Sequence, residues 1–334
     1  MKNKTVQWFC YTGSFLALLL GIGVLSLCVG SAGIPVKDVL SILFDKQGLS
    51  VQHSILMDVR LPRIILGIAV GGSLSLAGVI LQGLFRNPLV EPYTLGVSGG
   101  AALGVALSIL LGLHHWMGWT LPLFGFTGAL GVIGLLYMLN ARRGIVRLQG
   151  LLLNGVMLSF IASSLVMLIL SLSRAEDAHG IIFWIMGGLD EPQWSVIRVA
   201  ILGGITALAV SFCFVRDLNA ISLGEEEAKH LGINVEKTKR VLFLMTAFLT
   251  GLSVSVSGMI GFVGLVVPHA VRMIVGSDYR LLLPSAFLGG GAFLVFCDML
   301  ARILIMPQEL PVGVMTGILG GSFFIYALSR LENG

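Results

Sequence analysis

The stretch that decides the fold is RLPRIILGIAVGGSLSLAGVILQGLFRNPLVEPYTLGVSGGAALG, residues 60–104. Residues 61–83 form one continuous apolar run, about as long as a helix needs to be to cross the hydrocarbon core of a bilayer. A second apolar run begins at residue 93. The polar, proline-containing segment between the two runs cannot continue either helix. The stretch therefore predicts two membrane-spanning helices joined by an irregular segment.

The rest of the chain has the same character. Hydrophobic residues make up 56% of the 334 residues and charged residues 11%, whereas soluble domains carry about 25% charged residues. This composition excludes a water-soluble enzyme. Continuous apolar stretches occur at residues 8–31, 61–83, 93–113, 119–140, 149–172, 195–215, 240–262, 281–304 and 311–330.

A further stretch, residues 264–276, is short and is interrupted by Pro268, His269 and Arg272. Broken helices are tolerated in membranes where protein or a cavity satisfies the freed backbone groups. Counting this stretch as a span places most of the 21 Lys and Arg residues on the side of the N-terminus, as expected for cytoplasmic loops. The sequence therefore predicts an all-α polytopic membrane protein, one domain (1–334) of ten transmembrane helices with both termini in the cytoplasm.

A weak internal repeat relates the two halves of the chain. At an offset of 180 residues, Arg60 aligns with Arg240, Gly71 with Gly251, and Pro88 with Pro268. Because five predicted spans separate the copies, the second copy is expected to have inverted topology, as in many transporters. We place the first repeat at about residues 8–172 and the second at about 195–330.

The largest hydrophilic interruption is RDLNAISLGEEEAKHLGINVEKTKR, residues 216–240. Gly224 and Gly232 bracket a short segment with helical character. The segment is either a solvated cytoplasmic loop or a docking helix that receives force from a soluble partner. Its length and mixed charge favour contact with a protein surface over contact with lipid.

Arg60, Arg63 and Arg302 are predicted to lie at the external ends of their spans. Such residues commonly extend along apolar surface to reach the membrane interface. Alternatively, three cations on one face suit the acidic side chains of an external binding protein. Asp298, one helical turn before Arg302, is a candidate intramolecular partner.

Two further features bear on a transport path. The irregular residues Asn87, Pro88 and Leu89 are a gate candidate, because exposed backbone at membrane depth needs a cavity or a protein neighbour. Asn154 and Ser159 lie in an otherwise apolar span, where they either form interhelical hydrogen bonds or line a water path. Nearby glycines at four-residue spacing permit close helix packing.

The chain lacks the motifs of several enzyme classes. No G-x-x-x-x-G-K-[ST] motif occurs, so we expect no ATP site in this chain. The four cysteines lie in apolar runs without metal-ligand spacing, so we expect neither a disulfide nor a metal site. No catalytic residue and no cofactor of the chain's own is therefore predicted.

Several long motifs, in order, resemble the FecCD family of ABC-importer permeases, the type II importers that include cobalamin, iron-siderophore and haem permeases. The resemblance covers about residues 10 to 330. The matching stretches are residues 60–104, LGEEEAKHLGI (223–233), GMIGFVGLVVPHAVRMIVGSDYRLLLP (258–284) and ELPVGVMTGILGGSFFIYAL (309–328).

The resemblance implies a bacterial inner-membrane complex. Its parts are a second permease subunit, either a second copy or a paralogue, two cytoplasmic ATPase subunits that bind ATP and Mg, and an external substrate-binding protein. The complex lies in the lipid bilayer, and no nucleic acid partner is implied.

The resemblance also implies roles for particular residues. Asn87 and Leu89, on either side of Pro88, would form a cytoplasmic gate, and Leu148 and Gln149 would lie near a second gate. The family's short polar residues before the fifth span are replaced here by Val146 to Gln149. The arginines Arg60, Arg63 and Arg302 would meet acidic residues of the binding protein. The ATPase would contact Leu218, Asn219, Gly224, Glu225, Ala228, Leu231 and Gly232.

The expected function is ATP-driven import of a metal chelate, with an iron-siderophore first and cobalamin or haem next. The main alternative is an ion-coupled secondary transporter with inverted repeats. Such proteins usually keep acidic residues at mid-membrane, whereas Asp298 is the only acid well inside a clear predicted span and lies toward its end. A passive channel or structural subunit is a third possibility, disfavoured by the elaborate cytoplasmic loop.

Overall fold

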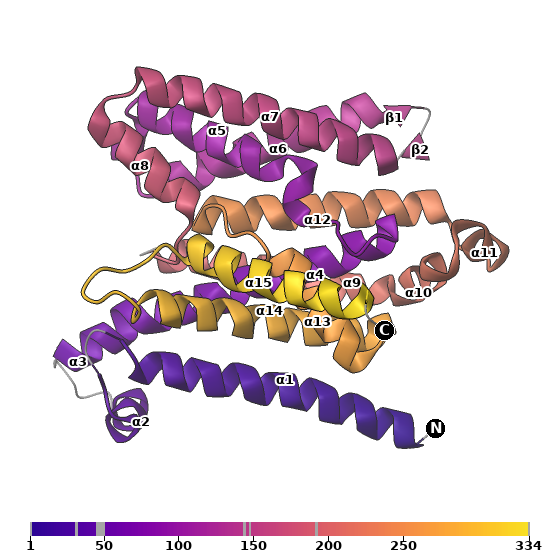
Figure 1. Ribbon diagram of the computed structural model, residues 1–334, viewed down its shortest axis with the longest axis horizontal. Coiled ribbons are helices and arrows are strands. Elements are labelled where there is room, and N and C mark those ends of the chain that lie inside the picture. The colour runs from indigo at the N-terminus through magenta and orange to yellow at the C-terminus, as the bar shows by residue number, and fades with distance from the viewer. Residues whose placement is uncertain are drawn as a thin grey trace.

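A computed structural model describes residues 2–30, 33–44, 51–142, 145–146, 148–190 and 193–332. The chain forms a bundle of helices that lie side by side along one axis (Figure 1). Seven helices in this part of the chain are long and apolar enough to cross a membrane. They are α1 (Lys2–Cys28), α4 (Leu61–Phe85), α6 (Thr120–Asn140), α7 (Leu148–Leu172), α9 (Trp194–Cys213), α12 (Val235–Ser257) and α14 (Tyr279–Ala301).

Three more helices have apolar stretches shorter than the seven above. They are α5 (Val97–Leu110), α13 (Val263–Val275) and α15 (Val312–Glu332), whose apolar part ends at Ala327. These helices fall on the remaining predicted spans, including the interrupted stretch 264–276. The all-helical membrane fold is therefore confirmed, while the exact number of ten crossings stays a prediction.

Short elements connect the long helices. They are α2 (Val36–Phe44), α3 (Val51–Ser54), a π-helical turn (Ile55–Arg60), two 3₁₀ turns (Pro92–Leu95 and Leu113–His115), α8 (Ala175–Met186), α10 (Val215–Leu223) and α11 (Glu225–His230). Strands β1 (Ala141–Arg142) and β2 (Ile145–Val146) form a two-stranded antiparallel hairpin. Both termini lie at the same end of the bundle as α10 and α11, whereas α2, α3 and α8 lie at the opposite end (Figure 1).

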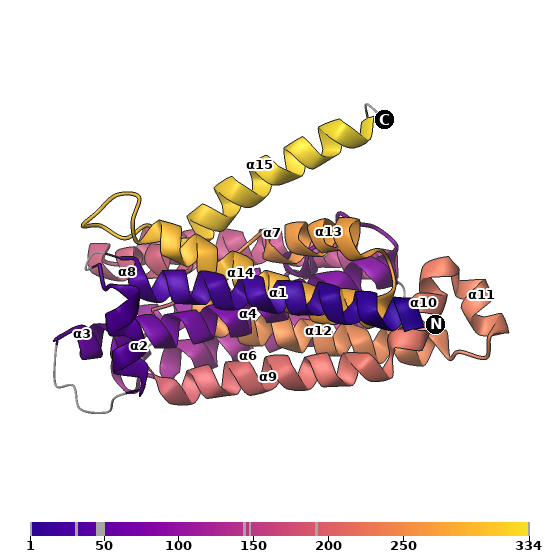
Figure 2. The ribbon, with the colours of Figure 1, turned by 90° about the horizontal axis from the view of Figure 1, so that it is seen from below.

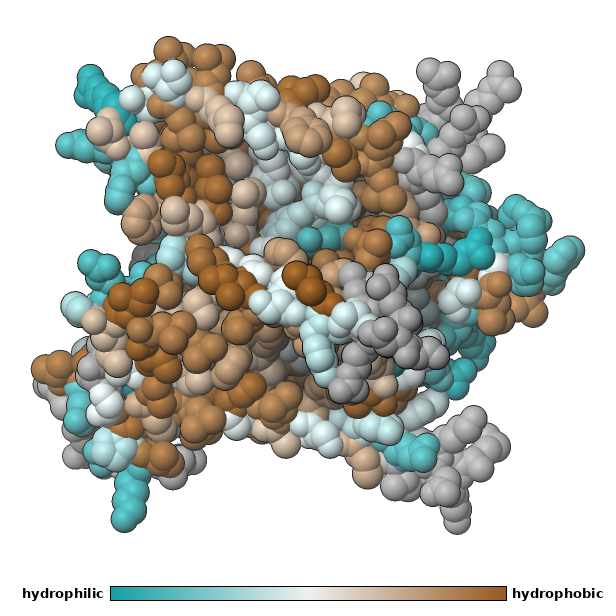
Figure 3. Space-filling model, viewed as in Figure 1, coloured by the Kyte–Doolittle hydropathy of each residue, from teal (hydrophilic) through white to brown (hydrophobic). Residues whose placement is uncertain are grey.

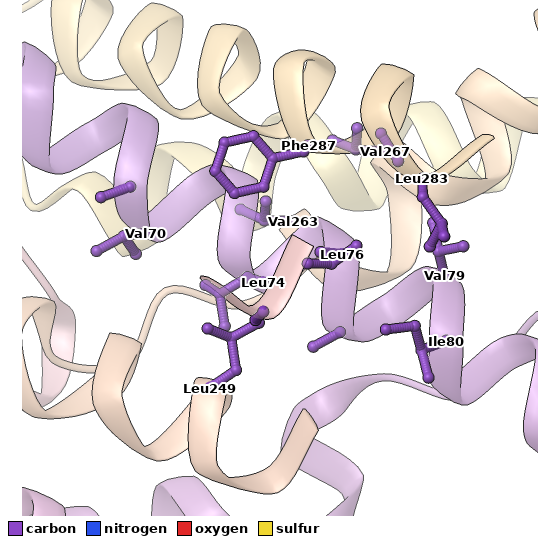
Figure 4. Packing of buried hydrophobic residues seen from close by; sticks show 14 of the residues in the cluster. Val70, Leu74, Leu76, Val79, Ile80, Leu249, Val263, Val267, Leu283 and Phe287 are labelled. Atoms are coloured by element: carbon purple, nitrogen blue, oxygen red, sulfur yellow. The ribbon is translucent and has the colours of Figure 1, made fainter. Parts of the chain in front are cut away.

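Helix α4 is the centre of the bundle. It is buried along nearly its whole length, whereas the apolar surfaces of α1 and α7 are mostly exposed, as expected for helices that face lipid. Apolar side chains from α4, α12, α13 and α14 interlock in the core around Leu74 and Phe287 (Figure 4). The surface seen in Figure 3 carries broad apolar areas, and hydrophilic residues gather toward the two ends.

Glycines let the central helices approach closely. A Cβ atom on Gly71 would collide with the carbonyl oxygen of Gly290 in α14, and one on Gly78 would collide with the carbonyl oxygen of Gly264 in α13. Gly100 and Gly104 of α5 meet the backbone of α6 in the same way. The predicted packing role of the regularly spaced glycines in 60–104 is thus confirmed.

Helix α15 departs from this arrangement. It leaves the bundle at an angle, so that its C-terminal half stands away from the other helices (Figure 2). Several of its apolar side chains are exposed, among them Ile318, Ile325 and Tyr326. This face is available to lipid or to another subunit.

Candidate functional site

The first candidate region is the pair α10 and α11 with the turns around them, residues 214–234, which we call the coupling element. It projects from the end of the bundle near both termini (Figures 1 and 2). Gly232 adopts a φ of 81°, a left-handed conformation that favours glycine and ends the turn after α11. Asn234 then caps α12, because its side chain accepts a hydrogen bond from the backbone N–H of Lys237 at 3.0 Å.

Polar contacts fix the coupling element to two long helices. The buried Lys239 Nζ of α12 lies 2.5 Å from Glu225 Oε2, and Thr238 Oγ1 donates a hydrogen bond to Asp217 Oδ2 at 2.6 Å. Asn219 Nδ2 donates to Asp278 Oδ1 at 3.1 Å, just before α14. These contacts join the coupling element to α12 and to the residue that precedes α14.

The structure corrects part of the predicted contact surface. Leu218 and Ala228 are fully buried in the apolar core, so they cannot contact a separate protein. The reason is that α10 and α11 are amphipathic and lie with these residues toward the bundle. Gly224 is buried as well, and Asn219 and Glu225 are partly buried and hold the element in place.

Only Leu231 and Gly232 of the predicted set are exposed, and the Leu231 side chain is 67% exposed. The exposed tip also includes residues that the sequence analysis did not select: Leu223, Glu226, Glu227, Lys229 and His230. Lys229 Nζ lies 2.7 Å from Glu226 Oε1, and this contact raises the pKa of Lys229 and lowers that of Glu226.

The second region is the segment after α4, residues 86–91, which we call the gate segment. Arg86 ends α4 in a left-handed conformation with a φ of 48°. Asn87 Oδ1 then accepts a hydrogen bond from the Leu89 backbone N–H at 2.9 Å. Asn87, Pro88 and Leu89 are all exposed. The irregular, accessible backbone expected here is present, while its role as a gate stays a prediction.

The other predicted gate and path residues lie on α7. Leu148 begins this helix, but the side chains of Leu148 and Gln149 lie outside the described residues. Asn154 Nδ2 donates to Asn140 Oδ1 of α6 at 3.0 Å, and Ser159 Oγ donates to the carbonyl of Gly155 in its own helix at 3.1 Å. Interhelical hydrogen bonding, one of the two predicted roles, is thus confirmed for Asn154.

The third region is an ion-pair cluster at the opposite end of the bundle. Arg63 Nη2 lies 2.9 Å from Asp298 Oδ1, and Arg302 Nε lies 3.0 Å from Asp298 Oδ2. Arg63 Nη1 also lies 2.7 Å from Asp190 Oδ1 and 2.7 Å from Glu309 Oε2. The cluster therefore joins α4, α14, and the loops on either side, α8–α9 and α14–α15. A cavity of about 450 Å³ opens beside it, lined by Arg63, Asp190, Glu309, Phe183 and Trp184 among others.

The structure buries all three predicted docking arginines among groups of the chain itself, and their role in docking an external protein stays a prediction. Arg60, Arg63 and Arg302 are between 3% and 7% exposed. Arg60 Nη1 donates to the Leu27 carbonyl at 2.5 Å, and Arg302 Nη2 donates to Ser26 Oγ at 2.5 Å, so both reach α1. Charged groups taken out of water must be paired to remain stable. Apart from Asp298, which lies four residues before Arg302 and was named in advance, the partners of these arginines lie far away in sequence.

The fold and these regions define a class: an all-helical membrane protein with a compact polar element that projects from one end of the bundle. Within the described residues, no cluster of three or more His, Cys, Asp or Glu side chains could hold a metal ion. Residues 18–330 match the model of the FecCD transport family.

Individual relatives agree with this match. The hemin transport system permease protein HmuU of Yersinia pestis is 38% identical over 337 residues, which cover 98% of both chains. The Fe(3+) dicitrate transport system permease protein FecD of Escherichia coli (strain K12) is 38% identical over 319 residues, 95% of this chain and 98% of the relative. A solved ABC transporter in an inward-facing conformation superposes with a TM-score of 0.84 at 30% identity, over 97% of this chain and 99% of that one.

The chain belongs to the FecCD transport family, whose members are permease subunits of ABC importers. It is a membrane-embedded transport protein, and the ion-coupled secondary transporter is not favoured.

Proposed function

We propose that the chain is the permease subunit of an ABC importer that moves a metal chelate into the cytoplasm, with an iron-siderophore first and haem or cobalamin next. The observation that carries the proposal is the coupling element. It presents an exposed tip of apolar and charged side chains beyond the bundle, and its base is fixed to α12 and α14 by Lys239, Thr238 and Asn219. A soluble ATPase bound to this tip would act on both helices.

The proposal sets the orientation and the partners. The end with α10, α11 and both termini faces the bacterial cytoplasm, where two ATPase subunits bind ATP and Mg. A second permease subunit, a copy of this chain or a paralogue, completes the path. The exposed apolar faces of α7 and α15 suit lipid and this second subunit.

The opposite end would receive the substrate-binding protein. Asp190 and Glu309 are 70% and 46% exposed, whereas Asp298 is buried. An acidic side chain of the binding protein would therefore reach Arg63 by replacing one of the two outer carboxylates, without breaking the inner pair with Asp298. The positive charge of Arg63 needed for docking is present, but in this structure it is paired with carboxylates of the chain's own loops.

Reconstitution tests the proposal. The chain is purified with its ATPase, placed in proteoliposomes with the binding protein, and supplied with a ferric siderophore, haem or cobalamin. We expect uptake of one of these chelates that depends on ATP and is abolished when the ATPase is omitted. Uptake driven by an ion gradient without the ATPase would contradict the proposal.

A further inference from the structure

Two irregular segments meet inside the helix bundle. One is the connection between α4 and α5, which contains the gate segment; the other is residues 258–262, between α12 and α13. Gly264 packs against Gly78, which lies about 10 Å before the end of α4 at 1.5 Å per residue. The meeting point is therefore within the length of the central helix, and the short helices α5 and α13 both begin close to it.

Three side chains bind backbone groups in or beside the irregular segment 258–262. Tyr93 Oη accepts a hydrogen bond from the Ile260 backbone N–H at 2.9 Å, and Gln82 Nε2 donates to the Gly264 carbonyl at 3.4 Å. Glu91 Oε1 accepts from the Phe262 backbone N–H at 2.6 Å. Unwound backbone inside a membrane protein needs such partners, so the first two contacts have a sufficient structural explanation.

The presence of Glu91 needs a further explanation, because placing a carboxylate at membrane depth costs more free energy than placing either of the other two groups there. Tyr93 accepts a hydrogen bond from the same kind of backbone group, the N–H of Ile260, without a charge. Among the described residues, Glu91 forms no ion pair. Its partner is the N-terminus of α13, where a negative charge is favoured by the helix dipole and the hydrogen bond is about twice as strong as a neutral one.

The two ends of this contact belong to different segments of the chain. Glu91 ends the gate segment, two residues after the exposed Leu89. Phe262 precedes α13 and follows α12, and the other end of α12 holds the coupling element through Lys239 and Glu225. Phe262 also has a φ of 68°, unusual for a residue other than glycine, so its position depends on the contacts around it.

We propose that Glu91 is a positioning residue that ties the gate segment to the N-terminus of α13, so that a movement of α12 driven at the coupling element is passed on to Leu89. This inference rests on the proposed function and adds the residue through which the ATPase would act on the gate. It makes the charge of Glu91, rather than its size, the important property.

The test follows the accessibility of the gate in the assembled transporter. Leu89→Cys is introduced after replacement of the four native cysteines, and its labelling by a thiol reagent is compared without nucleotide and with a trapped ATP state. With Glu91 present, we expect labelling rates in the two states to differ at least tenfold. Glu91→Ala should reduce this difference to less than twofold, with ATP hydrolysed per chelate imported rising about tenfold and the ATPase rate unchanged within twofold.

Two further variants separate positioning from simple backbone support. Glu91→Gln keeps an acceptor oxygen but loses the charge, so it should also lose most of the difference in labelling rate between the two nucleotide states. If Glu91→Ala does not assemble, Glu91→Gln alone tests whether the charge is needed. Tyr93→Phe removes the neighbouring neutral bond and should retain the difference. Retention in Glu91→Gln, or equal loss in Tyr93→Phe, would overturn the inference. Absence of ATP-dependent uptake with unaltered Glu91 would instead refute the proposed function, and the inference with it.

Discussion

Asp298→Ala tests whether the buried ion-pair cluster stabilises the fold. The Asp298 carboxylate is buried and lies between two buried guanidinium groups, 2.9 Å from Arg63 Nη2 and 3.0 Å from Arg302 Nε. After the substitution, Arg63 keeps Asp190 and Glu309. Arg302 keeps Ser26 but loses its carboxylate partner. Leaving a buried charge without its partner costs about 3–5 kcal/mol.

We expect the free energy of unfolding to fall by about 3–5 kcal/mol in Asp298→Ala. Asp190→Asn and Glu309→Gln remove carboxylates with exposed side chains, so each should change it by about 0–1 kcal/mol. Unfolding in detergent is followed by the fluorescence of the five tryptophans during titration with a denaturing detergent.

The double variant Asp298→Ala, Arg302→Leu is the matched control. Removing the unpaired guanidinium together with the carboxylate should recover a large part of the loss, because the main cost is the isolated charge. The reasoning is refuted if Asp298→Ala costs no more than Asp190→Asn, or if the double variant is less stable than Asp298→Ala alone.

Three other predictions concern packing and coupling. Gly71→Leu should prevent α4 from approaching α14 and reduce the yield of folded protein, measured by size-exclusion chromatography, at least severalfold. Gly317→Ala is the control and should match the unaltered chain, because no atom lies within 4 Å of the added carbon. Leu231→Asp should weaken binding of the ATPase at least tenfold in a pull-down, because Leu231 is exposed at the tip of the coupling element. Lys237→Ala, at another exposed residue, is the control. Equal binding of the ATPase by both variants would contradict the assignment of the tip as the contact surface. Lys239→Met should leave ATPase binding intact but lower ATP-driven uptake severalfold, because, of the two polar contacts described above, only Thr238–Asp217 then joins the element to α12. Unchanged uptake would show that the Lys239–Glu225 pair does not transmit movement.

The sequence was sufficient for features that depend on local pattern. Apolar runs located the long helices, and Pro268 marked the interrupted helix that the structure places at α13. Glycine spacing indicated the close approach of helices, because only the missing Cβ permits it.

Features that depend on distant residues were less accessible. Arg63 looks like an external cation in sequence because two of its carboxylate partners, Asp190 and Glu309, lie in loops more than a hundred residues away. Ala228 was assigned to a contact surface because a helix of six residues gives too little periodicity to decide which face is buried. Glu91 was overlooked because its partner is a backbone N–H group, which leaves no trace in the sequence.

The unequal exposure of the carboxylates around Arg63 gives this end of the protein a graded response to ionic strength. Salt screens exposed charges strongly and buried pairs much less. A rise in salt concentration will therefore loosen Asp190 and Glu309, and with them the α8–α9 and α14–α15 loops, while the joint between α4 and α14 at Asp298 holds. The contacts of Arg63 with the two exposed carboxylates can thus weaken at the surface without drawing on the stability of the bundle beneath them.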